Sequence, residues 1–166
     1  LTSWADKKHH RLELKVLKTA SKVVTVTWRS RDEFKALCGR NDIEVIPNGF
    51  DDADFPVDKR GPLDEEFTIV HIGSMNKDRN PEVFWKATHK ALAESPELKA
   101  KLKIRLVGPV DFSVRSSVEQ YDLQDYTEFV EFIPHDEAVK LQQQAQINLL
   151  VINNSPNSRT IIPGKL

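Results

Sequence analysis

Residues 67–73 read FTIVHIG, and residues 102–108 read LKIRLVG. Each stretch is a short, mostly apolar run that ends at a glycine, which is typical of a strand covered on both faces of a parallel sheet. Two further short, mostly apolar runs cover residues 128–132 and 147–152, the first followed by Ile133-Pro134 and the second by Asn153. The four runs predict the strands of one sheet.

Helical patterns separate these runs. Asn80 and Pro81 predict the start of a helix that continues to residue 94, because Asn caps helices and Pro fits the first helical position. Further helical patterns cover residues 113–121 and 136–144. Strands and helices that alternate in this way predict an α/β fold, a doubly wound open parallel sheet of the Rossmann type.

The preceding residues have a different organisation. Residues 1–47 predict a helix, a strand, a helix and a strand, with Ser30 as the cap of the second helix and Gly39 as its end. Residues 48–66 combine Gly and Pro breakers with many carboxylates, which indicates a linker or domain entry. The α/β domain then occupies residues 67–166.

Composition restricts the class of protein. The chain has 166 residues, 30% of them charged, and a net charge of -1, so it has no general attraction for nucleic acid or anionic membranes. Cys38 is the single cysteine, which excludes an internal disulfide and a CxxC metal site. No apolar run approaches the roughly 20 residues that a membrane span requires. We expect a cytoplasmic protein, and the start at Leu1 suggests a piece of something longer.

A ligand site is expected where the strands end, because open parallel sheets bind ligands beyond the carboxyl ends of their strands. Gly73 and Gly108 occupy two such ends, where glycine permits a sharp turn or the close approach of a ligand, although any turn after a strand can use a glycine. Lys77 and Arg79 follow the first glycine. Arg79 beside a helix N-terminus suits a diphosphate, and an exposed charged turn is the alternative.

Other motifs limit the kinds of ligand site and reaction that the sequence supports. Neither GxGxxG nor GxxxxGK[ST] is present, so the dinucleotide fingerprint and the standard P-loop are excluded. His71 lies inside a strand and is expected to be a core histidine, while His135 follows a strand and suits a capping or base-edge role. Trp28 and Trp85 are expected to pack in the interior. No pair or triplet of histidines has metal-ligand spacing.

Five short motifs, in order, resemble those of a known family. They read IEVIPNGFD, IVHIGS, LVG, VEFIPH and IPGKL, at residues 43–51, 69–74, 106–108, 130–135 and 162–166. Together they resemble the large group of retaining GT-B glycosyltransferases, group-1 or family-four-like, that use nucleotide-diphosphate sugars.

The resemblance implies a domain order and an activity. Residues 1–47 would end an acceptor domain, residues 48–66 would link the domains, and residues 67–166 would form most of the donor domain, truncated at Leu166 within the ligand site. The full-length enzyme would transfer a sugar from a nucleotide-diphosphate sugar to a glycan or lipid-linked acceptor, with retention, and without a metal or other cofactor. Acceptor binding, and any peripheral contact with the inner membrane face, would belong to regions outside this chain, so we expect residues 1–166 alone to be inactive.

Site residues follow by position in the same resemblance. The donor diphosphate would be bound by Gly73, Ser74, Lys77, Arg79, Gly164 and Lys165. The base and ribose would be bound by Gly108, Ile133, Pro134 and His135. Family members often carry Arg where this chain has Ser74, and one of their two usual glutamates aligns near Thr160 while the other would lie beyond Leu166. No catalytic residue is therefore assigned.

Two alternatives remain open. One is a sugar-nucleotide epimerase of GT-B architecture, over which the NGFD stretch at residues 48–51 favours the transferase. The other is a non-catalytic, doubly wound regulatory domain. That domain would need an acidic cluster at the strand ends, where this chain has glycine, proline and amide residues.

Overall fold

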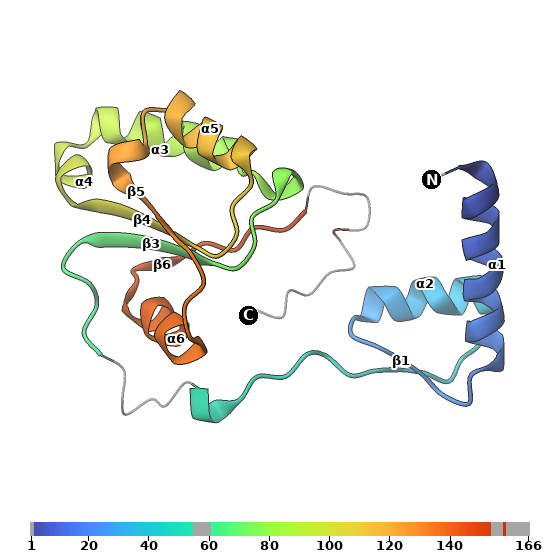
Figure 1. The fold of residues 1–166 in the computed structure, drawn as a ribbon. Coiled ribbons are helices and arrows are strands. Elements are labelled where there is room, and N and C mark those ends of the chain that lie inside the picture. The colour runs from blue at the N-terminus through green and yellow to red at the C-terminus, as the bar shows by residue number, and fades with distance from the viewer. Residues whose placement is uncertain (1, 55–60, 154–157, 159–166) are drawn as a thin grey trace. The chain divides into compact units, whose positions relative to one another are not determined.

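A computed structural model describes residues 2–54, 61–153 and 158. The described chain divides into two compact units, one within residues 2–49 and the other within residues 50–153 (Figure 1). Each unit is an α/β structure with a parallel sheet.

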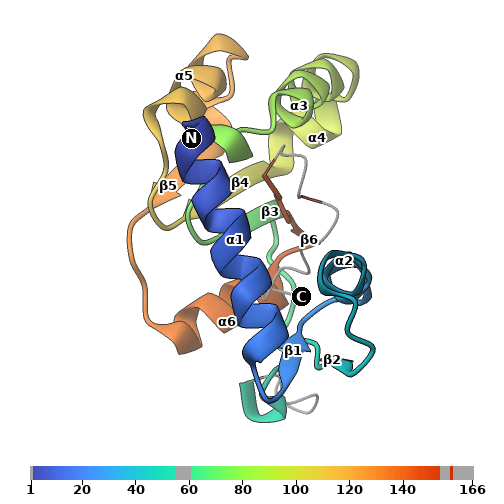
Figure 2. The same cartoon turned by 90° about the vertical axis from the view of Figure 1, so that its right-hand side faces the viewer.

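The first unit packs two helices against two short parallel strands. Its elements are α1 (Ser3–Thr19), β1 (Val23–Thr25), α2 (Trp28–Cys38) and β2 (Ile43–Val45), with both helices visible in Figure 2. Leu17, Val23 and Ile43 are buried together and form its core. Val23 lies beside Ile43 in the parallel register, so the two strands contribute adjacent side chains to that core.

The ends of α2 partly follow the sequence prediction. Gly39 ends the helix in the left-handed conformation, with φ 77°, and donates its N–H to the Lys35 carbonyl, as predicted. The prediction of Ser30 as the cap is wrong. Thr27 caps the helix, and its hydroxyl accepts from the Ser30 N–H at 3.0 Å. Ser30 therefore lies in the first turn, where its own N–H is the group that needs a partner.

The second unit contains a four-stranded, all-parallel sheet. Its strands are β3 (Phe67–Ile72), β4 (Leu102–Val107), β5 (Thr127–Val130) and β6 (Ile147–Asn148), in the spatial order β5-β4-β3-β6. Numbered along the unit, this is the order 3-2-1-4, the first part of the Rossmann arrangement. The predicted bounds of the first two strands are confirmed. The last strand is shorter than predicted, because only residues 147–148 pair with β3.

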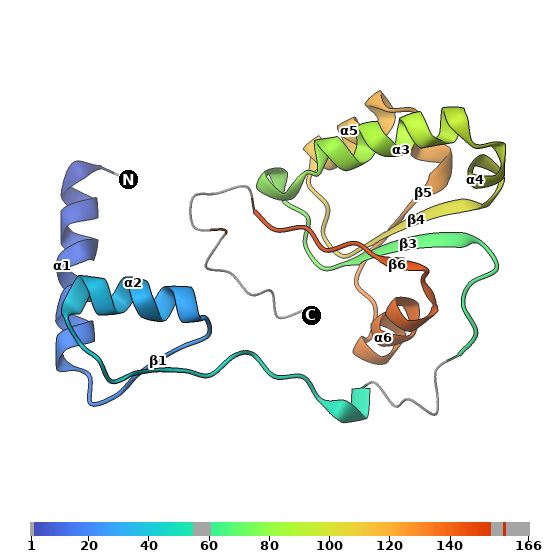
Figure 3. The same ribbon diagram turned by 180° about the vertical axis from the view of Figure 1, so that it is seen from behind.

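Helices cover both faces of this sheet. On one face lie α3 (Glu82–Glu94), α4 (Pro96–Lys101) and α5 (Phe112–Gln120), and on the other lies α6 (His135–Gln144) (Figures 1 and 3). The sheet is therefore doubly wound, as the sequence predicts. Short 3₁₀ turns occur at Asp52–Asp54, Lys77–Arg79 and Gln124–Tyr126.

Side chains from alternate positions of β3 and β4 build a core on each face. Ile69, Ile104 and Leu106 belong to a large cluster with Trp85, which is fully buried on α3. Val70 and Val107 belong to a smaller cluster on the other face, which Leu141 of α6 contacts. Burial on both faces explains why these strands are continuously apolar.

Asn80 has a different role from the predicted helix cap. Pro81 occupies the cap position of α3, and among the described residues no side chain caps the helix there. The Asn80 side chain instead accepts a hydrogen bond from Trp85 Nε1 at 2.7 Å and donates to the Ser117 hydroxyl at 2.8 Å. A buried indole N–H needs an acceptor, and Asn80 supplies it while tying α3 to α5.

Candidate functional site

The strand order has a switch point between β3 and β6. The connection after β3 leads to β4 on one side, whereas β6 pairs with β3 on the other side, so the order reverses between these two strands. In open α/β sheets, ligands bind at this switch point, outside the carboxyl ends of the strands. The candidate site therefore lies beyond Ile72 and Asn148.

A glycine turn follows each of the two central strands, β3 and β4, at the carboxyl edge of the sheet. Gly73 and Gly108 have φ values of 118° and 112°, which L side chains rarely adopt. Gly73 donates its N–H to the Val107 carbonyl at 2.7 Å, and Gly108 donates to the Val130 carbonyl at 2.9 Å. The turns thereby extend the sheet by one residue with bare backbone, which a ligand can approach closely.

The turns are also fixed to each other beyond the glycines. Met75 donates its N–H to the Pro109 carbonyl at 2.9 Å, and its own carbonyl accepts from the Asp111 N–H at 2.9 Å. The Met75 side chain is completely buried. The loops after β3 and β4 therefore form one rigid edge.

Arg79 lies at the switch point and bridges it. Its Nε donates to Asn153 Oδ1 at 2.5 Å, and Nη1 donates to the Ser74 carbonyl at 3.3 Å. Arg79 follows β3 in the chain, whereas Asn153 follows β6. Both acceptors are neutral, and within the described residues Arg79 forms no ion pair. The half-buried Arg79 side chain therefore has no counter-ion among the described residues, at the place where open α/β sheets bind ligands.

Ser74 and Lys77 are also predicted to bind the diphosphate, and both side chains are exposed. Ser74 is exposed, and its backbone carbonyl rather than its hydroxyl contacts Arg79. Lys77 is exposed in the 3₁₀ turn and acts on Asp111. The pKa of Asp111 is lowered mainly by hydrogen bonds from the hydroxyl and N–H of Ser113, with a further contribution from the Lys77 charge. The Lys77 charge is therefore partly directed at α5.

Three of the four residues predicted for the base and ribose follow β5, and the fourth, Gly108, follows β4. Ile133 is half-buried against the cluster on the α6 face, Pro134 is the cap residue of α6, and His135 is exposed at its first position. The end of β5 lies beside Gly108, through the bond to Val130. Gly164 and Lys165 lie outside the described residues.

His71 is a core residue, as predicted. Only 2% of its surface is exposed, and its Nδ1 lies 2.9 Å from the Leu149 carbonyl. Since a carbonyl can only accept, Nδ1 carries the proton. The Leu149 N–H in turn donates to the Val70 carbonyl at 2.7 Å. Both bonds hold the chain after β6 against β3 and direct it toward Arg79.

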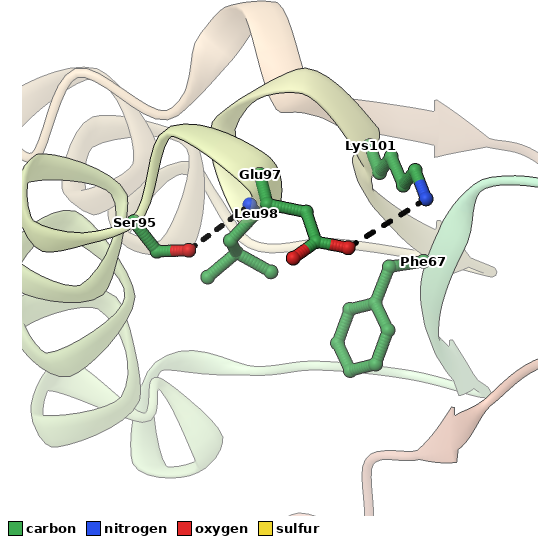
Figure 4. A pocket seen from close by; sticks show the side chains of 5 residues that line it. All are labelled: Phe67, Ser95, Glu97, Leu98 and Lys101. Atoms are coloured by element: carbon green, nitrogen blue, oxygen red, sulfur yellow. Dashed lines mark hydrogen bonds and ion pairs between the residues drawn. The ribbon is translucent and has the colours of Figure 1, made fainter.

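A hollow of about 220 Å³ lies elsewhere, near the start of β3 (Figure 4). Its lining residues are Phe67, Ser95, Glu97, Leu98 and Lys101. Glu97 and Lys101 pair with each other at 3.8 Å. This hollow is at the amino end of the strands, where open parallel sheets do not bind their main ligand.

Metal-ligand groups and membrane-spanning helices are absent from the described residues. No group of three or more His, Cys, Asp or Glu residues in the described chain is arranged to hold a metal ion. None of its helices has the length and apolar character needed to cross a membrane.

Comparison with known proteins identifies the fold. No protein-family model matches the sequence, and no curated protein sequence matches it. Solved structures do match. Sucrose-phosphate synthase from Thermosynechococcus elongatus has a TM-score of 0.64 at 20% identity, over 86% of this chain and 38% of that one.

Two other similar structures give the same picture. The trehalose-6-phosphate synthase OtsA has a TM-score of 0.62 at 12% identity, over 81% of this chain and 40% of that one. A variant of TarM from S. aureus, solved with fondaparinux, α-GlcNAc-glycerol and UDP, has a TM-score of 0.58 at 12% identity, over 85% of this chain and 27% of that one. The chain therefore has the fold of GT-B glycosyltransferases and spans less than half the length of these proteins.

Proposed function

We propose that this chain is the nucleotide-sugar-binding part of a retaining glycosyltransferase. The full-length protein would transfer a sugar from a nucleotide-diphosphate sugar to a glycan or lipid-linked acceptor. The proposal makes no use of a metal or other cofactor, because cationic side chains and backbone N–H groups would take the charge of the diphosphate. The observation that carries it is the Arg79 guanidinium, held at the switch point by neutral acceptors and without a counter-ion among the described residues.

The chemistry needs a cation at this position. When the bond between the sugar and the diphosphate breaks, negative charge develops on the departing diphosphate, and a fixed donor nearby stabilises it. A guanidinium suits this task because its planar donors match phosphate oxygens bidentately. The Nη2 group of Arg79 makes no hydrogen bond to any described residue, so it is free to donate to such a ligand.

The remaining site residues have distinct proposed roles. The turns at Gly73 and Gly108 would let the donor approach the backbone, with Ser74 and Lys77 near the diphosphate. Ile133, Pro134 and His135 would border the base and ribose. The presence of UDP in the TarM structure agrees with a nucleotide ligand for this fold.

Calorimetric titration tests the binding part of the proposal. The protein at its full natural length is titrated with UDP, GDP and ADP, as wild type and as Arg79→Ala. We expect wild type to bind one of them, and the variant to lose about 1.5–3 kcal/mol, the usual contribution of a charge-assisted hydrogen bond. The control is Lys86→Ala, which removes an exposed positive charge from α3.

The outcomes separate the alternatives. A wild-type protein that binds none of the three nucleotides would contradict the proposed function. Equal affinity of wild type and Arg79→Ala would contradict the role of Arg79 alone. A protein that interconverts sugar nucleotides without releasing the nucleoside diphosphate would be an epimerase.

A further inference from the structure

We infer that Asn153 is a positioning residue, which holds the Arg79 guanidinium across the switch point in the orientation that receives the diphosphate. The inference rests on the proposed function, which assigns the diphosphate to Arg79. It extends that function to a residue 74 positions away in the sequence, which follows β6 whereas Arg79 follows β3.

Arg79 and Asn153 are in direct contact. Arg79 Nε donates to Asn153 Oδ1 at 2.5 Å, and Nη1 donates to the Ser74 carbonyl at 3.3 Å. Because Nε–H can only donate, the amide oxygen of Asn153 must face it, so the orientation of the Asn153 amide is fixed by Arg79. These two bonds hold the guanidinium between Ser74 and Asn153, and Nη2 donates to no described residue.

Hydrogen bonds between β3 and the chain after β6 bring Asn153 close to Arg79. The chain after β6 is held on β3 by the Leu149 N–H, which donates to the Val70 carbonyl, and by the His71 Nδ1, which donates to the Leu149 carbonyl. Leu149 and Val151 also pack against the main core. Figure 3 shows this segment running alongside β3. Asn153 therefore approaches Arg79 on an anchored segment.

The acceptor that Asn153 provides is a neutral amide oxygen. A free arginine side chain loses rotamer entropy when it is fixed, so a residue that fixes it in advance reduces the cost of ligand binding. An amide oxygen does this without neutralising the positive charge. A carboxylate at the same place would hold the guanidinium equally well but would supply a counter-ion and compete with the diphosphate.

This difference defines the experiment. Asn153→Ala removes the contact, and Asn153→Asp keeps an acceptor but adds a negative charge. We expect UDP, GDP or ADP, whichever wild type binds most tightly, to bind about tenfold more weakly to each variant. The control is Gln124→Glu, which adds the same charge in the exposed 3₁₀ turn before β5, at the amino end of the sheet, with an expected change below about twofold.

A second readout does not depend on the ligand. In a ¹⁵N-edited NMR spectrum, the Arg79 Nε–H signal is assigned by its loss in Arg79→Lys. We expect a protected signal in wild type and in Asn153→Asp, and a rapidly exchanging one in Asn153→Ala. Urea unfolding of the three proteins shows whether each variant is folded, and Asn153→Asp is expected to be at least as stable as wild type.

Each result decides between the possibilities. Weaker binding by Asn153→Asp, with an intact Nε–H signal and full stability, supports the inference, since a purely structural tie would be rescued by aspartate. Wild-type affinity in both Asn153 variants, or an Nε–H signal unchanged by Asn153→Ala, would overturn it while leaving the proposed function standing. If wild type binds no nucleotide, the proposed function fails, and the inference fails with it.

Discussion

Gly108 lies so close to Gly73 that a Cβ added to Gly108 would be 3.0 Å from both the carbonyl carbon and the carbonyl oxygen of Gly73. The obstacle is backbone, which cannot move aside as a flexible side chain can. Both glycines also have φ values that L side chains rarely adopt. The two turns are thus packed backbone against backbone at the edge where the ligand is proposed to bind.

Gly108→Ala should therefore destabilise the second unit. Backbone strain and the steric contact with Gly73 together should reduce the free energy of unfolding by about 2–4 kcal/mol, measured by urea denaturation. Gly61→Ala is the control, because a Cβ there would meet only the end of the Gln144 side chain, at 3.3 Å. Equal stability of the two variants would show that the turns separate at low cost.

The Asn80 side chain should be among the most sensitive polar groups of the second unit. It accepts from the indole N–H of Trp85, a residue with no exposed surface, and donates to the Ser117 hydroxyl. Asn80→Ala leaves that N–H buried without a partner, which should reduce the free energy of unfolding by about 2–4 kcal/mol. The measurement is urea unfolding followed by tryptophan fluorescence. A change below about 0.5 kcal/mol would mean that water replaces Asn80.

Thr68→Val should have the opposite effect. The Thr68 hydroxyl is buried, and it has no hydrogen-bond partner among the described residues. The backbone N–H of Thr68, which donates to Gln146 Oε1 at 2.7 Å, is unchanged by the substitution. Removal of an unsatisfied buried hydroxyl should raise the free energy of unfolding by about 1 kcal/mol, measured by thermal denaturation. A loss of stability would instead indicate a bound water at the hydroxyl.

The elements that follow from local chemistry could be predicted from the sequence. β3 and β4 were predictable because helices cover both faces, so each strand is a continuous apolar run that ends at a glycine. The sequence analysis predicts a helix that continues to residue 94 and none over α4, because the Ser95-Pro96 pair that follows is also typical of the end of a helix. In the structure Ser95 caps α4, its hydroxyl accepting from the Leu98 N–H, and Pro96 takes the first helical position.

Burial and long-range contacts were harder to predict. Trp28 was expected to pack in the interior, and 57% of its surface is exposed. An aromatic residue at a helix start carries no local signal of which way it points. Asn153 has no motif around it either. Its contact with Arg79 depends on the strand order, since β6 must lie beside β3 before the two side chains can meet.

The first unit should show a defined acid dependence at Asp42. The Arg40 guanidinium, which donates to Asp42 at 2.6 Å, lowers the pKa of that carboxyl from 3.8 to about 2. A carboxyl with a lower pKa in the folded state stabilises the fold above its unfolded pKa, and this contribution is lost as the pH falls from about 4 to about 2. A carbon-detected NMR titration should give a midpoint near 2 for Asp42, and Arg40→Gln should raise it. A wild-type midpoint at 3.8 would contradict the pairing.

Arg79→Lys tests whether charge alone is sufficient at the proposed diphosphate site. Lysine keeps the positive charge but lacks the planar fork that holds Asn153 Oδ1 and the Ser74 carbonyl together. Its affinity for the nucleoside diphosphate should lie between those of wild type and Arg79→Ala, about 1 kcal/mol below wild type. The salt dependence should remain close to that of wild type, because the number of charges is unchanged.

A double-mutant cycle completes this prediction. If Asn153 acts through the guanidinium, Asn153→Ala should weaken binding in wild type and have almost no effect when Arg79 is already alanine. Additive effects in titrations of all four proteins would mean that Asn153 contacts the ligand independently. Equal affinity of Arg79→Lys and wild type for the nucleoside diphosphate would mean that a point charge is sufficient for binding. The orientation of the guanidinium by Asn153 and Ser74 would then have no function in binding.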